Sequence, residues 1–208
     1  MPNTPSKAAP PAAAAPGLPR PEDLQRVLAE TLVSSQPIFR GRILEVRRDQ
    51  VRLPNGGLAG REVVHHGGAV AITPLTEAGE VVLVYQYRYP IGRVTLEIPA
   101  GKLDPGEAPE ACARRELSEE TGYSAARLTL LFSLYTSPGF SDEVIHIYVA
   151  RGLRPGPSHP DADEDLRVVR LPLPAALEQV RSGEINDAKT VAALLALART
   201  ELSGGALS

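Results

Sequence analysis

The chain has 208 residues, of which 43% are hydrophobic and 23% charged, a composition typical of globular proteins. Its formal charge of −3 provides no basic field for nucleic acid, and no apolar run approaches the roughly 20 residues of a membrane span. A single cysteine excludes an internal disulfide framework and a cysteine-rich zinc site, so a reducing, cytoplasmic setting is expected.

Residues 1–21 form a segment rich in proline and alanine. Seven of the 20 prolines lie here, together with the run from Ala12 to Ala15, and there is no aromatic residue. Such a segment cannot bury enough apolar surface to offset the entropy lost on ordering, so it is predicted to be a disordered tail.

Residues 22–66 are predicted to form a short helix followed by extended strands. Four aliphatic residues recur at helical spacing: Leu24, Val27, Leu28 and Leu32. From Ile38 the pattern changes to short extended runs, which are separated by a Pro-Asn-Gly-Gly turn at 54–57. A further strand is predicted over 61–64.

Three stronger strands are predicted farther along, over 69–74, 81–89 and 144–150. The second of them is rich in β-branched and aromatic residues. Two helices are predicted near the C-terminus, one over 174–182 and one capped by Asp187. One face of the second helix is expected to carry Val191, Leu194, Leu195 and Ala198. Strands mixed with helices indicate an α/β domain with a mixed sheet.

An acidic cluster lies on a helix predicted between Pro109, which suits a first turn, and Gly122, which suits a stop. Glu116, Glu119 and Glu120 share one face of this helix, where like charges repel. Two interpretations follow from the triplet alone. It is a solvated acidic surface, or it is a site for a hard divalent cation such as Mg²⁺.

The wider spacing around this helix resembles the Nudix box. Seven letters match exactly: Gly101, Glu107, Arg115, Glu116, Glu119, Glu120 and Gly122. Leu117 and Tyr123 fill its two aliphatic or aromatic positions. The chain therefore resembles the Nudix hydrolases, which cleave nucleoside diphosphates linked to another moiety with Mg²⁺ or Mn²⁺.

Further motifs resemble the ADP-ribose pyrophosphatase branch of that family, from about Gln36 to Ala198. They lie at 41–43, 53–56, 61–64, 68–71, 86–88, 96–101, 137–143 and 187–190. Pro138, 16 residues after Gly122, has the placement that marks this branch. The resemblance implies hydrolysis of ADP-ribose to AMP and ribose 5-phosphate.

The resemblance also implies a fold and an assembly. The expected fold is the α/β Nudix fold, a mixed sheet between helices (α/β/α), over residues 67–202. An antiparallel strand extension over residues 22–66 precedes it. Relatives are dimers in which such strands cross to the partner, so a homodimer with swapped extensions is expected.

Metal ligation follows from the resemblance. Glu116 and Glu120 are expected to be the main ligands of two or three Mg²⁺ or Mn²⁺ ions, with Glu119 and the Ala100 carbonyl completing the set. Arg115 is expected to pair with Glu107 or Glu119 and to orient that carboxylate. Gly101 is expected to let the backbone turn, so that the Ala100 carbonyl faces the metal.

Substrate contacts are assigned in the same way. Arg88 and Arg61 match arginines that contact substrate, although an ion pair with Glu62 explains Arg61 equally well. A charged residue that interrupts an apolar strand needs a partner, and Glu97 is a candidate either for orienting Arg88 or for a position near the metal.

Phe39 is a candidate for stacking on adenine, with a core position as the alternative. Glu143 is a candidate contact for the terminal ribose. The four histidines have no metal-site spacing and are interpreted as structural, as is Cys112, expected on a buried helix face.

The general base is expected in the acidic loop at 159–165. Ala162 stands where relatives often have glutamate, so Glu164 is the candidate. The alternatives are that the loop is offset by a residue or two, or that the base is Glu119 or a metal-bound hydroxide and the loop is a solvated turn.

Two other functions remain open. The substrate could be GDP-mannose or another sugar nucleotide, since base specificity depends on a few contacts. Alternatively, the domain could be a non-catalytic Nudix module that senses a nucleotide sugar, although such domains usually lose box carboxylates and all are intact here.

Overall fold

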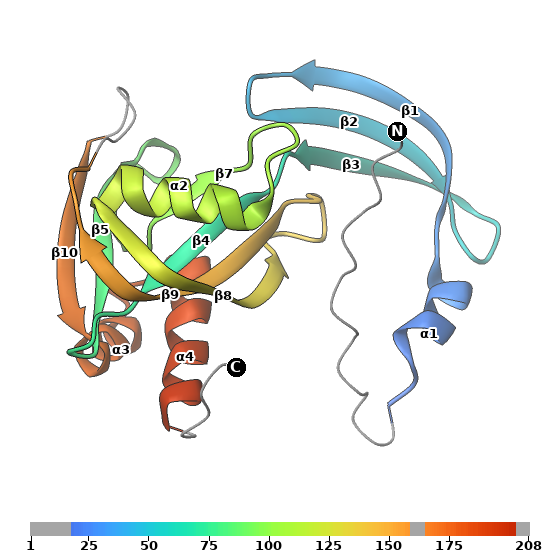
Figure 1. Cartoon of the computed structure of the whole chain (residues 1–208). Coiled ribbons are helices and arrows are strands. Elements are labelled where there is room, and N and C mark those ends of the chain that lie inside the picture. The colour runs from blue at the N-terminus through green and yellow to red at the C-terminus, as the bar shows by residue number, and fades with distance from the viewer. Residues whose placement is uncertain (1–17, 159–164, 203–208) are drawn as a thin grey trace, which may run out of the picture.

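The computed structural model describes residues 18–158 and 165–202, shown in Figure 1. The helices are α1 (Pro21–Leu28), α2 (Pro109–Thr121), α3 (Leu173–Ser182) and α4 (Ala188–Leu202), and a 3₁₀ turn spans Tyr89–Ile91. The strands are β1 (Thr31–Arg40), β2 (Leu44–Arg52), β3 (Leu58–His66), β4 (Ala69–Pro74), β5 (Glu80–Arg88), β6 (Arg93–Glu97), β7 (Ala100–Lys102), β8 (Tyr123–Tyr135), β9 (Val144–Pro155) and β10 (Leu166–Pro172). Most of the predicted tail, residues 1–17, lies outside the described residues.

The strands form three sheets. A mixed sheet has the order β7-β4-β9-β8, with β4 parallel to β9 and antiparallel to β7. A second, antiparallel sheet has the order β10-β5-β6. The third, β1-β2-β3, is also antiparallel and forms the N-terminal extension together with α1.

Side-chain alternation along β4 builds the layers of the body. Val70 and Ile72 face one side and pack in a core cluster with residues of α2, such as Leu117. Ala69 and Ala71 face the other side, in a cluster that includes residues of the second sheet, α3 and α4. Helices therefore cover both faces of the strands (Figure 1), which confirms the expected α/β fold with helices outside a mixed sheet.

The predicted elements are confirmed in the core and differ at the edges. Leu32 is not in the first helix, because α1 ends at Leu28 and β1 begins at Thr31. Leu195 is exposed, so it does not share the buried face of α4 that holds Leu194 and Ala198. Strand β8 was not predicted. It is an edge strand whose residues are half-buried or exposed, so it lacks the apolar periodicity that marks a core strand.

The extension lies to one side of the body in Figure 1 and carries many uncovered apolar side chains. No residue of α1 is buried. Exposed large apolar residues of the extension are Leu24, Val27, Leu28, Leu32, Val33, Ile38, Phe39, Ile43 and Leu58. No helix in the described part of the chain is both long and apolar enough to cross a membrane.

Candidate active site

Helix α2 carries the acidic cluster, and its ends are those that the sequence predicts. Pro109 occupies the first turn, and Gly122 ends the helix in the left-handed conformation with φ of 72°. Glu116 and Glu120 are only 9% and 3% exposed, whereas carboxylates are seldom buried without partners. Glu119 lies nearer the surface. The solvated-surface interpretation therefore does not hold for two of the three carboxylates.

Strand β7 approaches α2 so closely that only glycine fits at position 101. A Cβ atom on Gly101 would lie 1.8 Å from the carboxyl carbon of Glu116. Gly101 lies within a strand and is not among the glycines with positive φ, so the expected backbone turn is not present. One residue earlier, the Ala100 N–H donates to Oε2 of Glu120 at 3.1 Å. Both buried carboxylates therefore lie against β7.

Arg115 joins the carboxylates of the box into one network. Its guanidinium donates to both oxygens of Glu107 at 3.0 Å. Nη1 also donates to Glu116 at 2.7 Å and to Glu119 at 2.9 Å. The structure thus pairs Arg115 with both carboxylates that the sequence offered as alternatives. The hydrogen bonds from Arg115 lower the pKa of Glu107 to about 2, which keeps that carboxylate charged at neutral pH.

The donor chemistry at α2 and β7 fits a hard divalent cation. The groups are carboxylate and backbone oxygens, which Mg²⁺ and Mn²⁺ prefer over nitrogen or sulfur ligands. The missing Cβ of Gly101 keeps the space in which the Glu116 carboxylate lies. Among residues 18–158 and 165–202, no three His, Cys, Asp or Glu side chains are grouped as a ready ligand set. Protein donors hold these carboxylates instead.

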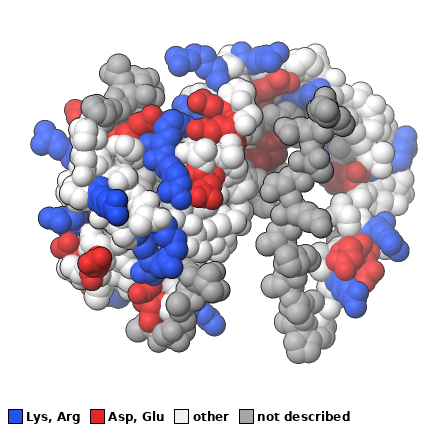
Figure 2. All heavy atoms as spheres, in the orientation of Figure 1, with Lys and Arg blue, Asp and Glu red and all other residues white. Residues whose placement is uncertain are grey.

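A cleft of about 540 Å³ opens beside this cluster. Strand β7, the start of α4, the end of β3 and the loop before β9 all contribute to its lining. It brings together the predicted site residues Arg88, Ala100 and Glu143, and adds His66 and Lys189, to which the sequence assigned no role in the site. Figure 2 shows acidic and basic side chains side by side on the surface over α2.

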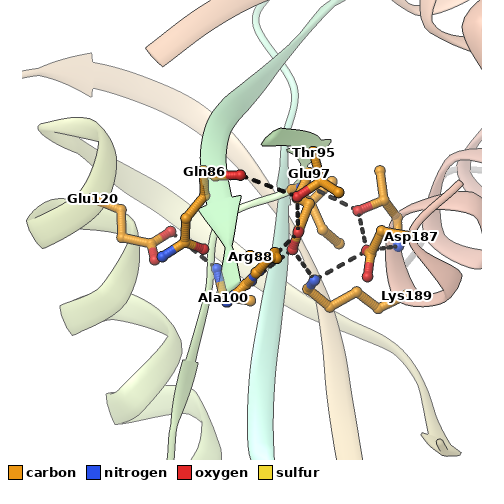
Figure 3. A network of polar contacts seen from close by, with 10 residues as sticks. Gln86, Arg88, Thr95, Glu97, Ala100, Glu120, Asp187 and Lys189 are labelled. Carbon is orange, nitrogen blue, oxygen red and sulfur yellow. Dashed lines mark hydrogen bonds and ion pairs between the residues drawn. The ribbon is translucent and has the colours of Figure 1, made fainter. Parts of the chain in front are cut away.

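Glu97 connects Arg88 to the start of α4, as Figure 3 shows. Arg88 donates to the two Glu97 oxygens through Nε at 2.8 Å and Nη2 at 2.7 Å, which confirms the predicted partner of Arg88. The Thr95 hydroxyl donates to Glu97 Oε1 at 2.5 Å, and Lys189 Nζ forms an ion pair with Oε2.

Glu97 is only 2% exposed and yet ionised. Burial by itself would raise its pKa, but the hydrogen bonds from Arg88 and the positive charge of Lys189 outweigh burial and lower the pKa to about 2. Lys189 was not included in the site predicted from the sequence, because a lysine at the start of a helix is usually exposed to solvent. Its place at the start of a helix with a predicted apolar face was the one sequence feature that could have indicated its burial.

Glu143 also lines the cleft, and two polar side chains lie next to its carboxylate. Thr136 Oγ1 donates to one carboxylate oxygen at 2.6 Å, and His66 Nδ1 lies 3.4 Å from the other. His66 Nδ1 also accepts the Gly68 N–H at 3.1 Å. Asp142 accepts the His66 backbone N–H at 2.9 Å, so the loop carrying Glu143 is tied to the end of β3.

Arg61 and Phe39 do not reach this cleft. Arg61 pairs with Glu30, at 3.0 Å from Nε, and not with Glu62 as the sequence suggested. Adjacent residues of a strand point to opposite faces, which explains the difference. Phe39 is 57% exposed, so the alternative of a core position is wrong. Glu164 lies outside the described residues, so its placement relative to the cleft is not part of the structure.

Two family models match the chain in succession. A model described as the nucleoside diphosphate sugar hydrolase N-terminal domain matches residues 30–64, which coincide with most of the strand extension. A model described as the NUDIX domain matches residues 64–194, and this range includes α2 and all the residues that line the cleft except Ile43.

Relatives match over most of their length. An ADP-ribose pyrophosphatase from Bacillus subtilis is 44% identical over 80% of this chain and 91% of its own. A methanol dehydrogenase activator from Bacillus methanolicus is 43% identical over 81% of this chain and 92% of its own. A GDP-mannose pyrophosphatase from Salmonella arizonae is 40% identical over 69% of this chain and 80% of its own.

The fold is also found in a solved structure. A crystal structure of an ADP compounds hydrolase superposes with a TM-score of 0.75 at 29% identity, over 84% of this chain and 95% of the other. The NUDIX model covers more than half of the chain, and the relatives are well above 30% identical. By sequence, by fold and by the intact carboxylate helix, the chain belongs to the Nudix family.

Proposed function

We propose that the protein hydrolyses the diphosphate of ADP-ribose to AMP and ribose 5-phosphate with a divalent cation. One observation carries the proposal. A cleft lined by Arg88, Ala100 and Gly101 opens beside the buried carboxylates of α2, which lie against β7, and Glu97 holds the Arg88 guanidinium. A diphosphate between two sugars needs cations along its middle and polar groups at its ends. The names of the ADP-ribose pyrophosphatase relative and of the ADP compounds hydrolase support the same substrate.

The metal is proposed to be Mg²⁺, with Mn²⁺ as a substitute, in two or three ions per site. Glu116, Glu119, Glu120 and the Ala100 carbonyl would hold it. A bound divalent cation would offset the charge of the diphosphate and lower the pKa of the attacking water. Arg115 orients the carboxylates, because its guanidinium contacts Glu116 and Glu119 simultaneously.

Arg88 and Glu143, which line the cleft, are proposed to bind the substrate. Arg88 donates to the diphosphate, since Nε and Nη2 are engaged by Glu97 and Nη1 has no hydrogen bond among the described residues. Glu143 accepts a hydrogen bond from a hydroxyl of the terminal ribose, and the hydrogen bond from Thr136 holds the carboxylate in place. Glu164 is proposed as the general base.

A homodimer is proposed to complete the site. Arg61 and Phe39 lie on the extension and away from the cleft of their own chain, so they would contact substrate in the partner's cleft. The uncovered apolar residues of the extension give a reason for association, since large exposed apolar areas mark interfaces. A monomeric mass in light scattering at micromolar concentration would contradict this.

A cytoplasmic location is proposed from the buried, unpaired Cys112.

The test is hydrolysis of ADP-ribose and of GDP-mannose with Mg²⁺ by the wild type, Glu120→Gln and Glu164→Gln. We expect AMP from ADP-ribose, near-complete loss in Glu120→Gln, and a comparable loss in Glu164→Gln. Normal activity in Glu164→Gln would remove Glu164 as the base and leave Glu119 or a metal-bound hydroxide as the candidates.

GDP-mannose is the second candidate substrate, because a GDP-mannose pyrophosphatase is 40% identical to this chain. Faster release of GMP than of AMP in the same assay would favour it. No product from either sugar nucleotide would reject hydrolysis. It would then favour a sensing or activating role, as the name of the methanol dehydrogenase activator suggests for that relative.

A further inference from the structure

Lys189 at the start of α4 lines the cleft and pairs with Glu97, but the proposed reaction gives it no function. It is 8% exposed, which is rare for lysine. Its ammonium group forms ion pairs with Glu97 and with Asp187, the latter at 3.0 Å. Both partners are carboxylates of the protein, so the ammonium is already engaged without a ligand.

The position of Lys189 is set by contacts between α4 and the end of β6. Asp187 caps α4, accepting the Thr190 N–H at 3.0 Å. The Thr190 hydroxyl accepts the Ile98 N–H at 3.0 Å. Ile98 follows Glu97 directly, so the same short segment is bonded to α4 by its backbone and by its carboxylate. These contacts place Lys189 within reach of the Glu97 carboxylate.

The charges of the network balance. Glu97 and Asp187 each carry a negative charge, and Arg88 and Lys189 each carry a positive one (Figure 3). Removing one partner from a buried network leaves an uncompensated charge, which the remaining groups must rearrange to satisfy. Without Lys189, both carboxylates would compete for the Arg88 guanidinium. That competition would draw Arg88 away from a ligand.

We propose that Lys189 is a positioning residue that holds Glu97 so that Glu97 presents the Arg88 guanidinium to the substrate diphosphate. The proposal rests on the proposed function only in taking a diphosphate as the ligand. Lys189 occupies Oε2 of Glu97, and Thr95 occupies Oε1. The carboxylate therefore cannot rotate without losing a bond, and the two-point pair with Arg88 keeps its plane.

The experiment is a double-mutant cycle read by calorimetric binding of ADP in the presence of Mg²⁺. We expect Lys189→Met to weaken ADP binding about tenfold and Arg88→Met at least as much. In the Arg88→Met background, Lys189→Met should change binding less than about twofold, because its effect passes through Arg88. Lys189→Arg, which keeps the charge, should restore binding to within about threefold of wild type.

Two results would overturn the proposal. One is ADP binding by Lys189→Met within about twofold of wild type. The other is the same loss in both backgrounds, which would indicate a general effect of charge. Leu194→Ala serves as the control for weaker packing of α4, because Leu194 is fully buried in the core cluster and absent from the cleft lining. It should lower stability and leave the affinity for ADP unchanged.

A measurement without ligand separates this proposal from the proposed function. The Arg88 Nε–H resonance, assigned with Arg88→Lys, should shift and exchange faster with solvent in Lys189→Met. An unchanged resonance would reject the positioning role, whatever the substrate is. A changed resonance in a protein that hydrolyses no ADP-ribose would reject the proposed substrate and keep the positioning role.

Discussion

The cleft and the N-terminal extension hold their charged residues in different ways. Glu97 is buried and receives donors from Arg88, Thr95 and Lys189. Arg61 is an exposed side chain whose carboxylate partner, Glu30, lies 31 residues away on the surface. Buried, fully bonded networks hold side chains in one geometry, whereas exposed ion pairs contribute little and exchange readily with water.

This difference indicates what one chain builds by itself. The carboxylates of α2 and the Arg88 network are formed within a single chain, because α2 and α4 pack in core clusters on opposite faces of β4, and β7 pairs with β4 in the same sheet. The extension offers arginine and aromatic groups on a surface that nothing in the described chain covers. Each variant below tests whether the cleft depends on precise packing and the extension on a second chain.

The largest effect is expected for Gly101→Ala. The added Cβ would meet the Glu116 carboxylate at 1.8 Å, so that carboxylate must move away from β7. We expect at least about a 100-fold loss of kcat/KM, since a misplacement of 1 Å can cost that much. Gly60→Ala is the matched control, because nothing lies within 4 Å of its Cβ position. Equal activity of the two variants would show that the close contact at β7 does not matter.

The next largest effect separates two neighbouring arginines of α2. Arg115→Met removes the hydrogen bonds to Glu107, Glu116 and Glu119, and we expect the Mg²⁺ concentration for half-activity to rise about 10- to 100-fold. Arg114→Met removes an exposed ion pair with Glu110 and should leave the Mg²⁺ concentration for half-activity within about twofold of wild type. Similar Mg²⁺ activation curves for both variants would contradict an orienting role for Arg115.

The buried network predicts a dependence of stability on pH. The folded-state pKa of Glu97 is about 2, below its value in the unfolded chain, so its stabilisation is present above about pH 4.5 and is lost as the pH falls toward 2. We expect wild type to lose about 2 kcal/mol more than Glu97→Gln between pH 6 and pH 3 in urea unfolding. An exposed control, Glu77→Gln, should follow wild type. Parallel curves for wild type and Glu97→Gln would show that Glu97 is not stabilised as an ion.

The smallest effect is expected on the extension, and it tests the partner directly. Arg61→Met should lower kcat/KM about tenfold by raising KM, because the contact between the Arg61 guanidinium and the substrate is lost. Unfolding should be unchanged, because the pair with Glu30 is exposed.

Mixing Arg61→Met chains with inactive Glu120→Gln chains tests whether the extension of one chain reaches the cleft of its partner. Hybrid dimers would then contain one cleft with Glu120 from one chain and Arg61 from the other. Activity above the sum of the separate variants is expected after exchange of subunits. No recovery in proven hybrids would place Arg61 in its own chain's site or in none.

Local spacing accounts for what could be predicted at the site. Glu116, Glu119 and Glu120 share a face because residues three and four apart are neighbours on any helix, and Arg115 reaches Glu119 for the same reason. The ends of α2 at Pro109 and Gly122 follow from backbone chemistry. The family match depends on the same local pattern.

Contacts between distant segments account for the rest. The reason for Gly101 is a carboxylate 15 positions away on α2, and the partner of Arg61 is a residue of the loop before β1. Edge strand β8 was missed because weak burial leaves weak periodicity. His66 lines the cleft next to Glu143, a residue of a distant loop. No spacing in the sequence indicates that these two residues are neighbours.

The sequence by itself determined the family, the α/β fold class and the helix that carries the carboxylates, because these depend on patterns within a few turns of chain. The tertiary structure decided which charges are buried and with what partners. Lys189 and Glu97 lie 92 residues apart, and only the packing of α4 on the end of β6 brings them together. Burial then makes that pair matter, because a charge removed from water must find its partner within the protein.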